Sequence, residues 1–184
     1  MKKILNAIIM LLGLSAAGMA QSQPCVTLKQ VYEVIKDVDP AVALKGTCLK
    51  EYCYHRFEGR VYGMAWGHNV NDQRYELTNP YYMEHGSGNS TIFVYTPNVD
   101  NWILSFTDTT LLSGYLKEAQ QMGFRFISSE EGKKIQREDS TFVTAYDLQW
   151  AEAPTPYNTI GILAYPEKVM IHFYILRADA HKDD

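Results

Sequence analysis

From Arg60 onward, the chain alternates short runs of aromatic and β-branched residues with clusters of Gly, Asn, Asp or Pro. Such runs are typical of β-strands, and turn residues between them favour antiparallel pairing of neighbouring strands. The last two strands are predicted to form a hairpin, and because both of their faces carry apolar residues they are expected to lie inside the sheet. The predicted strands are residues 61–66, 75–78, 91–96, 101–107, 141–149, 159–165 and 169–176.

Two amphipathic segments precede these strands. Thr27 opens a capping-box pattern ahead of an apolar stripe of helical spacing. Asp39 followed by Pro40 has the pattern of a helix N-cap and first turn, and apolar residues recur at helical spacing as far as Cys53, although Gly46 weakens this second helix. The two segments are therefore predicted to form a helical hairpin that covers a sheet.

A third helix is expected to begin after Asp108 or Thr110, either of which can cap it. Its apolar stripe runs from Leu112 to Met122 and ends at Gly123 and Phe124 in the pattern of a glycine C-terminal cap. Ordered along the chain, the elements read helix, helix, four strands, helix, three strands. This order predicts an α+β fold: a two-layer sandwich in which a helical hairpin and one further helix pack on a mostly antiparallel sheet of about six to seven strands. It also suggests two architectural units, although no residue-level repeat accompanies them.

The N-terminal residues have the pattern of an export signal. Lys2 and Lys3 precede an apolar run over 4–14 that is too short to span a bilayer, and small residues then lead up to Gln21. We interpret residues 1–20 as a cleavable signal peptide. The mature chain is therefore expected to reach the periplasm or the exterior of a bacterial cell.

Removal of residues 1–20 would leave 164 residues (184 minus 20), which is a usual size for one domain. We predict a single globular domain over 21–178 and a polar C-terminal tail over 179–184. Losing Lys2 and Lys3 takes the formal charge from −4 to −6, so a nucleic-acid partner is not expected. No later apolar stretch is long enough to predict a membrane span.

Three cysteines, Cys25, Cys48 and Cys53, make one disulfide and one spare thiol the expected arrangement in an exported chain. On one continuous helix, Cys48 and Cys53 would lie beyond disulfide reach of each other. Cys25 is therefore predicted to pair with either Cys48 or Cys53. A zinc site built from these cysteines and His55 is disfavoured because the ligand spacing is loose, and no metal or cofactor is expected.

Candidate ligand-binding residues come from loops rich in aromatic and imidazole side chains. Thirteen tyrosines and three tryptophans are many for this length, and rings near loops suit stacking on sugars or gripping peptides. Trp150 and Tyr157 are two such rings, although the same rings could simply cover the edge of the sheet. The residues selected as a ligand-binding set are Trp66, His68, Tyr81, Tyr82 and His85.

No catalytic residues are assigned, because the loop imidazoles and carboxylates show no spacing that requires them to meet. The favoured function is a non-catalytic binding or interaction module of the bacterial envelope, with an envelope protein, a peptide or a glycan as partner. The alternative is a small periplasmic hydrolase whose site combines His68 or His85 with a carboxylate. A purely structural partner of an envelope complex is a third possibility.

Overall fold

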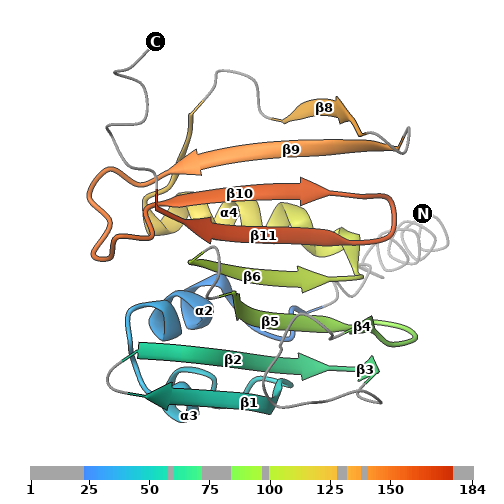
Figure 1. Ribbon diagram of the computed structural model, residues 1–184. Coiled ribbons are helices and arrows are strands. Elements are labelled where there is room, and N and C mark those ends of the chain that lie inside the picture. Colours follow the sequence, from blue (N-terminus) through green and yellow to red (C-terminus); the bar gives the residue numbers. More distant parts are fainter. Residues whose placement is uncertain are drawn as a thin grey trace, which may run out of the picture.

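The structure is a computed structural model that describes residues 23–57, 60–71, 84–96, 100–127, 132–137 and 141–175. Strands dominate its regular structure (Figure 1). The strands are β1 (Lys50–Phe57), β2 (Arg60–His68), β3 (Val70–Asn71), β4 (Glu84–His85), β5 (Thr91–Thr96), β6 (Asn101–Phe106), β7 (Arg125–Phe126), β8 (Lys133–Gln136), β9 (Phe142–Gln149), β10 (Thr159–Ala164) and β11 (Val169–Tyr174). The helices are α2 (Leu28–Ile35), α3 (Pro40–Ala43), the 3-10 helix η3 (Thr109–Leu111) and α4 (Leu112–Met122).

Nine of the strands form one antiparallel sheet in the order β1-β2-β5-β6-β11-β10-β9-β7, and β8 also pairs with β9. β3 and β4 form a separate two-stranded ribbon. The sheet falls into two halves, because β6 and β11 are each the last strand of a helix-then-strands unit and pair with each other at the centre. This arrangement agrees with the two-unit pattern of the sequence.

The predicted two-layer sandwich with a helical hairpin is wrong in its details, although the broad α+β character holds. The sheet has nine strands instead of six to seven, and no helical hairpin is present among the described residues. The second helix ends at Ala43, and Gly46 then adopts a left-handed φ of 80°, which a continuing helix does not allow. The segment expected to complete this helix instead pairs with β2 as strand β1.

The core lies between the sheet and the helices, which all pack on the same face of the sheet (Figure 1). Alternate residues of the central strands point into it and are almost fully buried, as the period of a strand requires. These strand residues are Phe93, Trp102, Leu104, Phe106, Ile160, Ile162, Ile171 and Phe173. The opposite face carries a smaller cluster formed by Ala65, Ile92 and Val94.

Local capping signals in the sequence determine where the two longer helices begin and end. The Thr27 hydroxyl accepts a hydrogen bond from Gln30 N, and the Gln30 side chain accepts one from Thr27 N, so the predicted capping box is confirmed. α4 ends at Gly123, whose φ of 117° is left-handed, and Phe124 N donates to Ala119 O, which confirms the predicted cap.

α4 also caps α2 directly. The two carboxylate oxygens of Glu118 accept hydrogen bonds from Leu28 N and Lys29 N, each at 2.9 Å. These are amides of the first helical turn, which have no partner within a helix, and a negative charge is favoured at a helix N-terminus. One side chain of the second half of the molecule therefore stabilises the helix of the first half.

A disulfide joins Cys25 to Cys48 across a Cα–Cα distance of 5.2 Å, so the prediction that Cys25 pairs with one of the two other cysteines is confirmed. The expectation that Cys48 and Cys53 share a helix is wrong, because Cys48 precedes β1 and Cys53 lies within it. The bond therefore ties the segment before α2 to the start of an edge strand.

Several predicted features lie outside the described residues. These are the signal peptide, the C-terminal tail, the strand over 75–78, and the loop residues Tyr81 and Tyr82. Among the helices that are described, none is both long enough and apolar enough to cross a membrane.

Candidate ligand-binding surface

The structure does not bring the described members of the predicted ligand-binding set together at one concave site. Trp66 is only 3% exposed and stacks on Phe93 with the ring centroids 5.4 Å apart, so it is a core residue with little surface to offer a ligand. His68 and His85 are both partly buried, and each has its own local environment.

His85 bridges two buried serines. Its Nδ1 lies 2.9 Å from Ser90 Oγ and its Nε2 lies 2.8 Å from Ser105 Oγ. Burial lowers the pKa of His85 below its ordinary value, and the positive charge of Lys168 lowers it further. The imidazole therefore fastens the β3–β4 ribbon to the end of the main sheet.

A serine hydroxyl hydrogen-bonded to an imidazole is also the first requirement of a serine hydrolase. Here Ser90 and Ser105 are 1% and 6% exposed, respectively. A substrate needs access to the attacking oxygen, and the described hydrogen bonds of His85 are to hydroxyls rather than to a carboxylate. The hydrogen bonds of His85 to Ser90 and Ser105 therefore hold neighbouring segments of the fold together, and we call them the His85 clamp.

His68 lies beside the disulfide. One of its ring nitrogens and the sulfur atoms of Cys25 and Cys48 are all within 4.8 Å of one another. His172 is different again: it is half-buried on β11 with Nδ1 3.0 Å from Asn101 Nδ2, as expected for a hydrogen-bonded histidine inside a strong strand. Burial lowers its pKa.

Two cavities in the described part of the chain have aromatic linings, and both are centred on Trp150, just after β9. One cavity of about 380 Å³ lies where α2 and α4 meet this residue. Its apolar walls are Tyr32, Met122, Trp150 and Pro154, and Lys29, Glu33, Lys36, Glu118 and Gln121 form its polar lining.

A second cavity, of about 500 Å³, lies at the C-terminal end of α4. It is lined by Gly123, Arg125, Phe126, Ile127, Gln149, Trp150, Ala151 and Glu152. Trp150 lines both cavities, and Ile127 in the second cavity is 52% exposed, so its aliphatic side chain is accessible to a ligand. We call the walls of the two cavities together the Trp150 surface.

Three neighbours fix the position of the Trp150 ring. It lies 5.8 Å from the ring of Tyr32 and 5.5 Å from that of Phe124, centroid to centroid. Gly123 allows the closest approach, because a Cβ built on this glycine would lie 2.7 Å from Trp150 Nε1. The indole is therefore rigidly placed before any ligand arrives, which reduces the entropy lost on binding.

Most charged groups around the Trp150 surface already have protein partners. Lys36 and Glu33 form an ion pair at 2.7 Å, and Glu118 caps α2. Arg125 Nη1 donates to two backbone carbonyls, those of Gln120 and Phe124. The part of the surface that remains to drive binding is consequently mainly apolar.

Tyr157, the other loop-proximal ring singled out in the sequence, is tied into the fold. Its hydroxyl donates to Asp100 Oδ1, and its backbone carbonyl accepts from the Tyr32 hydroxyl at 2.8 Å. Burial and the nearby Asp100 carboxylate raise the pKa of the Tyr157 phenol, which therefore stays protonated. For Tyr157, covering the sheet is the better supported of the two roles considered for these rings.

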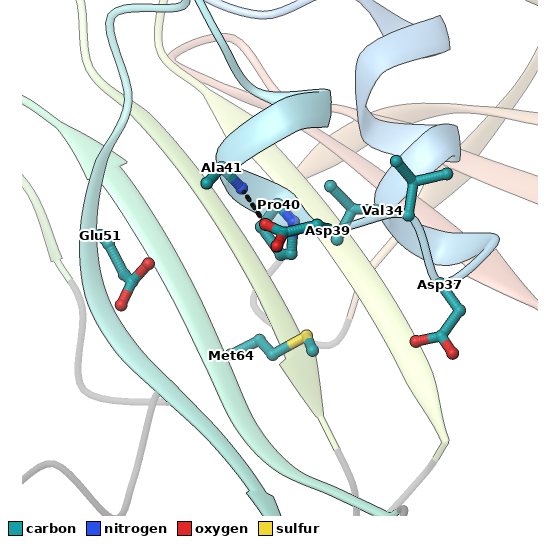
Figure 2. Close-up of a pocket in the computed structure, with 8 residues that line it drawn as sticks. Val34, Asp37, Asp39, Pro40, Ala41, Glu51 and Met64 are labelled. Atoms are coloured by element: carbon teal, nitrogen blue, oxygen red, sulfur yellow. Dashed lines mark hydrogen bonds between the residues drawn. The ribbon is translucent and has the colours of Figure 1, made fainter.

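A third cavity, of about 270 Å³, lies on the first half of the molecule beside α3. Figure 2 shows Asp37, Asp39 and Glu51 around Val34 and Met64; the first two carboxylates come from the α2–α3 connection and the third from β1. Asp39 caps α3 by accepting from Ala41 N at 2.8 Å. In the described part of the chain these acids do not form a group tight enough to share one metal ion.

Comparison of the chain with protein-family models, with curated proteins and with solved structures gave no match. The class that the geometry defines is thus an antiparallel α+β protein with an aromatic concave surface on its helical layer.

Proposed function

We propose that the protein is an exported, non-catalytic binding module of the bacterial envelope that binds peptide segments at the Trp150 surface. The observation that carries this proposal is that one partly exposed, rigidly held indole lines two cavities, with the exposed Ile127 beside it. Tryptophan is one of the most common anchors of protein recognition, and binding pockets are lined mainly by hydrophobic side chains.

A peptide fits this surface better than a glycan because of how the polar groups are used. Sugar recognition needs several free donors and acceptors to match the hydroxyls of the ligand, whereas Glu118, Arg125 and the Glu33–Lys36 pair are already engaged. Met122 and Pro154 add apolar contact, and an unbranched methionine adapts to side chains of different shapes. Apolar or aromatic peptide side chains are therefore the expected anchors.

Export is part of the proposal and rests on two features. Residues 1–20 have the pattern of a signal peptide, and Cys25 and Cys48 form a disulfide, a bond that persists in oxidising compartments. Expression of the full chain in a Gram-negative host, followed by cell fractionation and N-terminal sequencing, tests it. A mature protein that begins at Gln21 in the periplasm is expected, and an uncleaved cytoplasmic product would contradict this part.

The binding test uses the oxidised chain from Gln21 onward against a phage-displayed library of random peptides. Selected peptides are expected to be enriched in aromatic and large aliphatic residues. An array of bacterial surface glycans is probed in parallel, and glycan binding that depends on Trp150 without any selected peptide would overturn the peptide assignment.

Matched variants locate the site. Ile127→Asp places a charge on the Trp150 surface, whereas Val42→Asp makes the same kind of change at an α3 residue that is 66% exposed and lines neither cavity. Because both side chains are exposed, neither change should unfold the protein. Ile127→Asp is expected to lower the affinity for the selected peptides about tenfold or more, whereas Val42→Asp should leave that affinity unchanged. Equal effects of the two substitutions would contradict the proposal.

A further inference from the structure

The disulfide and its neighbour His68 form a compact set of soft ligands. A ring nitrogen of His68 and the sulfur atoms of Cys25 and Cys48 lie within 4.8 Å of one another. Cysteine thiolate and imidazole are the donors that zinc prefers, and three protein ligands leave a fourth position for water. We propose that, once the disulfide is reduced, Cys25, Cys48 and His68 bind a zinc ion, so that this corner of the molecule exchanges a covalent crosslink for a metal crosslink.

The change in geometry that zinc requires is small. In a tetrahedral site with ordinary Zn–S and Zn–N bonds, the two sulfurs lie about 3.8 Å apart and the nitrogen lies about 3.6 Å from each sulfur. Starting from separations within 4.8 Å, the imidazole approaches by about 1 Å. The sulfurs separate by themselves once the bond between them is broken, because two unbonded sulfur atoms cannot remain at disulfide distance.

The backbone around the three ligands is held by contacts that do not depend on the disulfide. Cys48 N donates to Cys25 O at 3.3 Å, and the Tyr115 hydroxyl donates to Val26 O at 2.6 Å. His68 lies on β2 and pairs with Thr91 of β5. Reduction therefore leaves the three side chains near one another.

Access to the site is asymmetric. Cys48 is exposed, whereas Cys25 and His68 are partly buried. A reductant or a metal ion can therefore approach at Cys48, while the inner ligands are kept in position by the fold. A ligand set that is open on one side suits a three-coordinate protein site with water as the fourth ligand.

The chemistry balances with one added reductant. A phosphine and a water molecule supply two electrons and two protons, so the disulfide becomes two thiols and the phosphine becomes its oxide; a dithiol does the same and becomes a disulfide. Zinc then binds two thiolates and the neutral imidazole, and the two thiol protons are released. No oxidation state of the metal changes.

The test uses the protein from Gln21 onward, anaerobically reduced with a phosphine, which competes for zinc less than a dithiol would. Isothermal titration with zinc chloride is expected to give one ion per chain. Titration with cobalt(II) is expected to give the absorption of a tetrahedral site with thiolate ligands. The oxidised protein, with its sulfurs already joined, should bind neither ion at this site.

His68→Ala is expected to weaken zinc binding about tenfold or more, because one of the three protein ligands is lost while both thiols remain. His172→Gln removes an imidazole that is hydrogen-bonded to Asn101 instead and should leave the affinity unchanged. Cys53→Ser removes the third thiol and should also leave one zinc per chain, whereas the double variant Cys25→Ser, Cys48→Ser should abolish binding.

Two results would overturn the proposal: a reduced protein that does not take up zinc stoichiometrically, or an affinity that His68→Ala leaves unchanged. Loss of binding on Cys53→Ser alone would do the same, since the ligands would then be different ones. If the reduced protein unfolds, circular dichroism with and without zinc still tests the site. Zinc should restore the folded spectrum of the reduced wild type and should not restore that of the double cysteine variant.

Discussion

Gly123 is the residue on which the placement of Trp150 depends. Its left-handed φ of 117° ends α4, and the indole lies where a side chain at this position would be. Gly123→Ala should therefore destabilise the protein by about 1–3 kcal/mol and displace the Trp150 ring. Denaturant unfolding measures the first effect, and the tryptophan emission spectrum measures the second.

A matched control lies in the same helix. Gly114 is in the first turn of α4, and a Cβ added there would meet no other atom within 4 Å. Gly114→Ala should therefore stabilise the protein by roughly 0.5–1 kcal/mol through helix propensity alone. Effects of the same sign for the two alanine variants would contradict the role given to Gly123.

The clamp made by His85 gives stability a pH dependence. The fold lowers the pKa of both His85 and His172, so the unfolded chain takes up protons at a higher pH than the folded one. The stabilisation is present above the unfolded pKa of about 6.5 and is lost as the pH falls below it, by up to about 1.4 kcal/mol per pH unit for each histidine.

Urea unfolding at a series of pH values from neutral to acidic measures this loss. His85→Gln should reduce its steepness. A wild-type stability that stays constant through this range, or a slope that His85→Gln leaves unaltered, would show that the imidazole is not held in its neutral form.

At the scale of elements, the Cys25–Cys48 disulfide spans 23 residues and closes a loop that contains α2 and α3. Because the crosslink lowers the conformational entropy of the unfolded chain, it raises the free energy of unfolding by about 3 kcal/mol for a loop of this length. The double variant Cys25→Ser, Cys48→Ser should lose about this much in denaturant unfolding without metal. A loss equally large for Cys53→Ser would contradict the assigned pairing.

Glu118 connects the two halves of the molecule through the first turn of α2. Glu118→Ala removes both accepting oxygens and should cost about 1–2 kcal/mol, since two amides lose their partner at a helix N-terminus. Glu33→Ala, which breaks only a surface ion pair on α2, is the control and should cost less than about 1 kcal/mol. Unfolding curves that rank the two variants the other way round would rule out this cap.

Elements with local signals could be predicted from the sequence, and elements that depend on distant partners could not. Strand β5 carries its own pattern and has the predicted bounds. Helix α4 ends at the predicted glycine, but Asp108 caps the 3-10 helix η3, so α4 begins only at Leu112. The sequence predicts strand β1 as part of a helix because its apolar residues also fit a helical period, and only pairing with β2 decides between the two. The edge strand β8 is exposed throughout and has no apolar alternation to reveal it.

The same distinction holds for the candidate site. The sequence marks Trp150 as a ring near a loop. Its position at the surface, however, depends on contacts with Tyr32 and Gly123, which are distant in the chain. Trp66 belongs to the predicted set because it precedes a glycine and two polar residues, whereas strand alternation turns it into the core. Side chains alternate between the two faces of a strand, and which face is buried depends on helices that are distant in the chain.

At the scale of the whole molecule, the three tryptophans differ sharply in accessibility. Trp66 and Trp102 are 3% and 4% exposed, whereas Trp150 is only partly buried at the surface assigned to the ligand. A small neutral quencher such as acrylamide should therefore act mainly on Trp150. Trp150→Phe should remove most of the quenchable emission of the folded protein.

The most direct test of the Trp150 surface is acrylamide quenching of the oxidised protein with and without a peptide selected from the random library. Saturating peptide is expected to shield Trp150 and remove most of the quenching, while a scrambled peptide of the same composition should have no effect. Quenching that stays unchanged when the selected peptide is bound would contradict it, because the ligand would then lie elsewhere on the molecule.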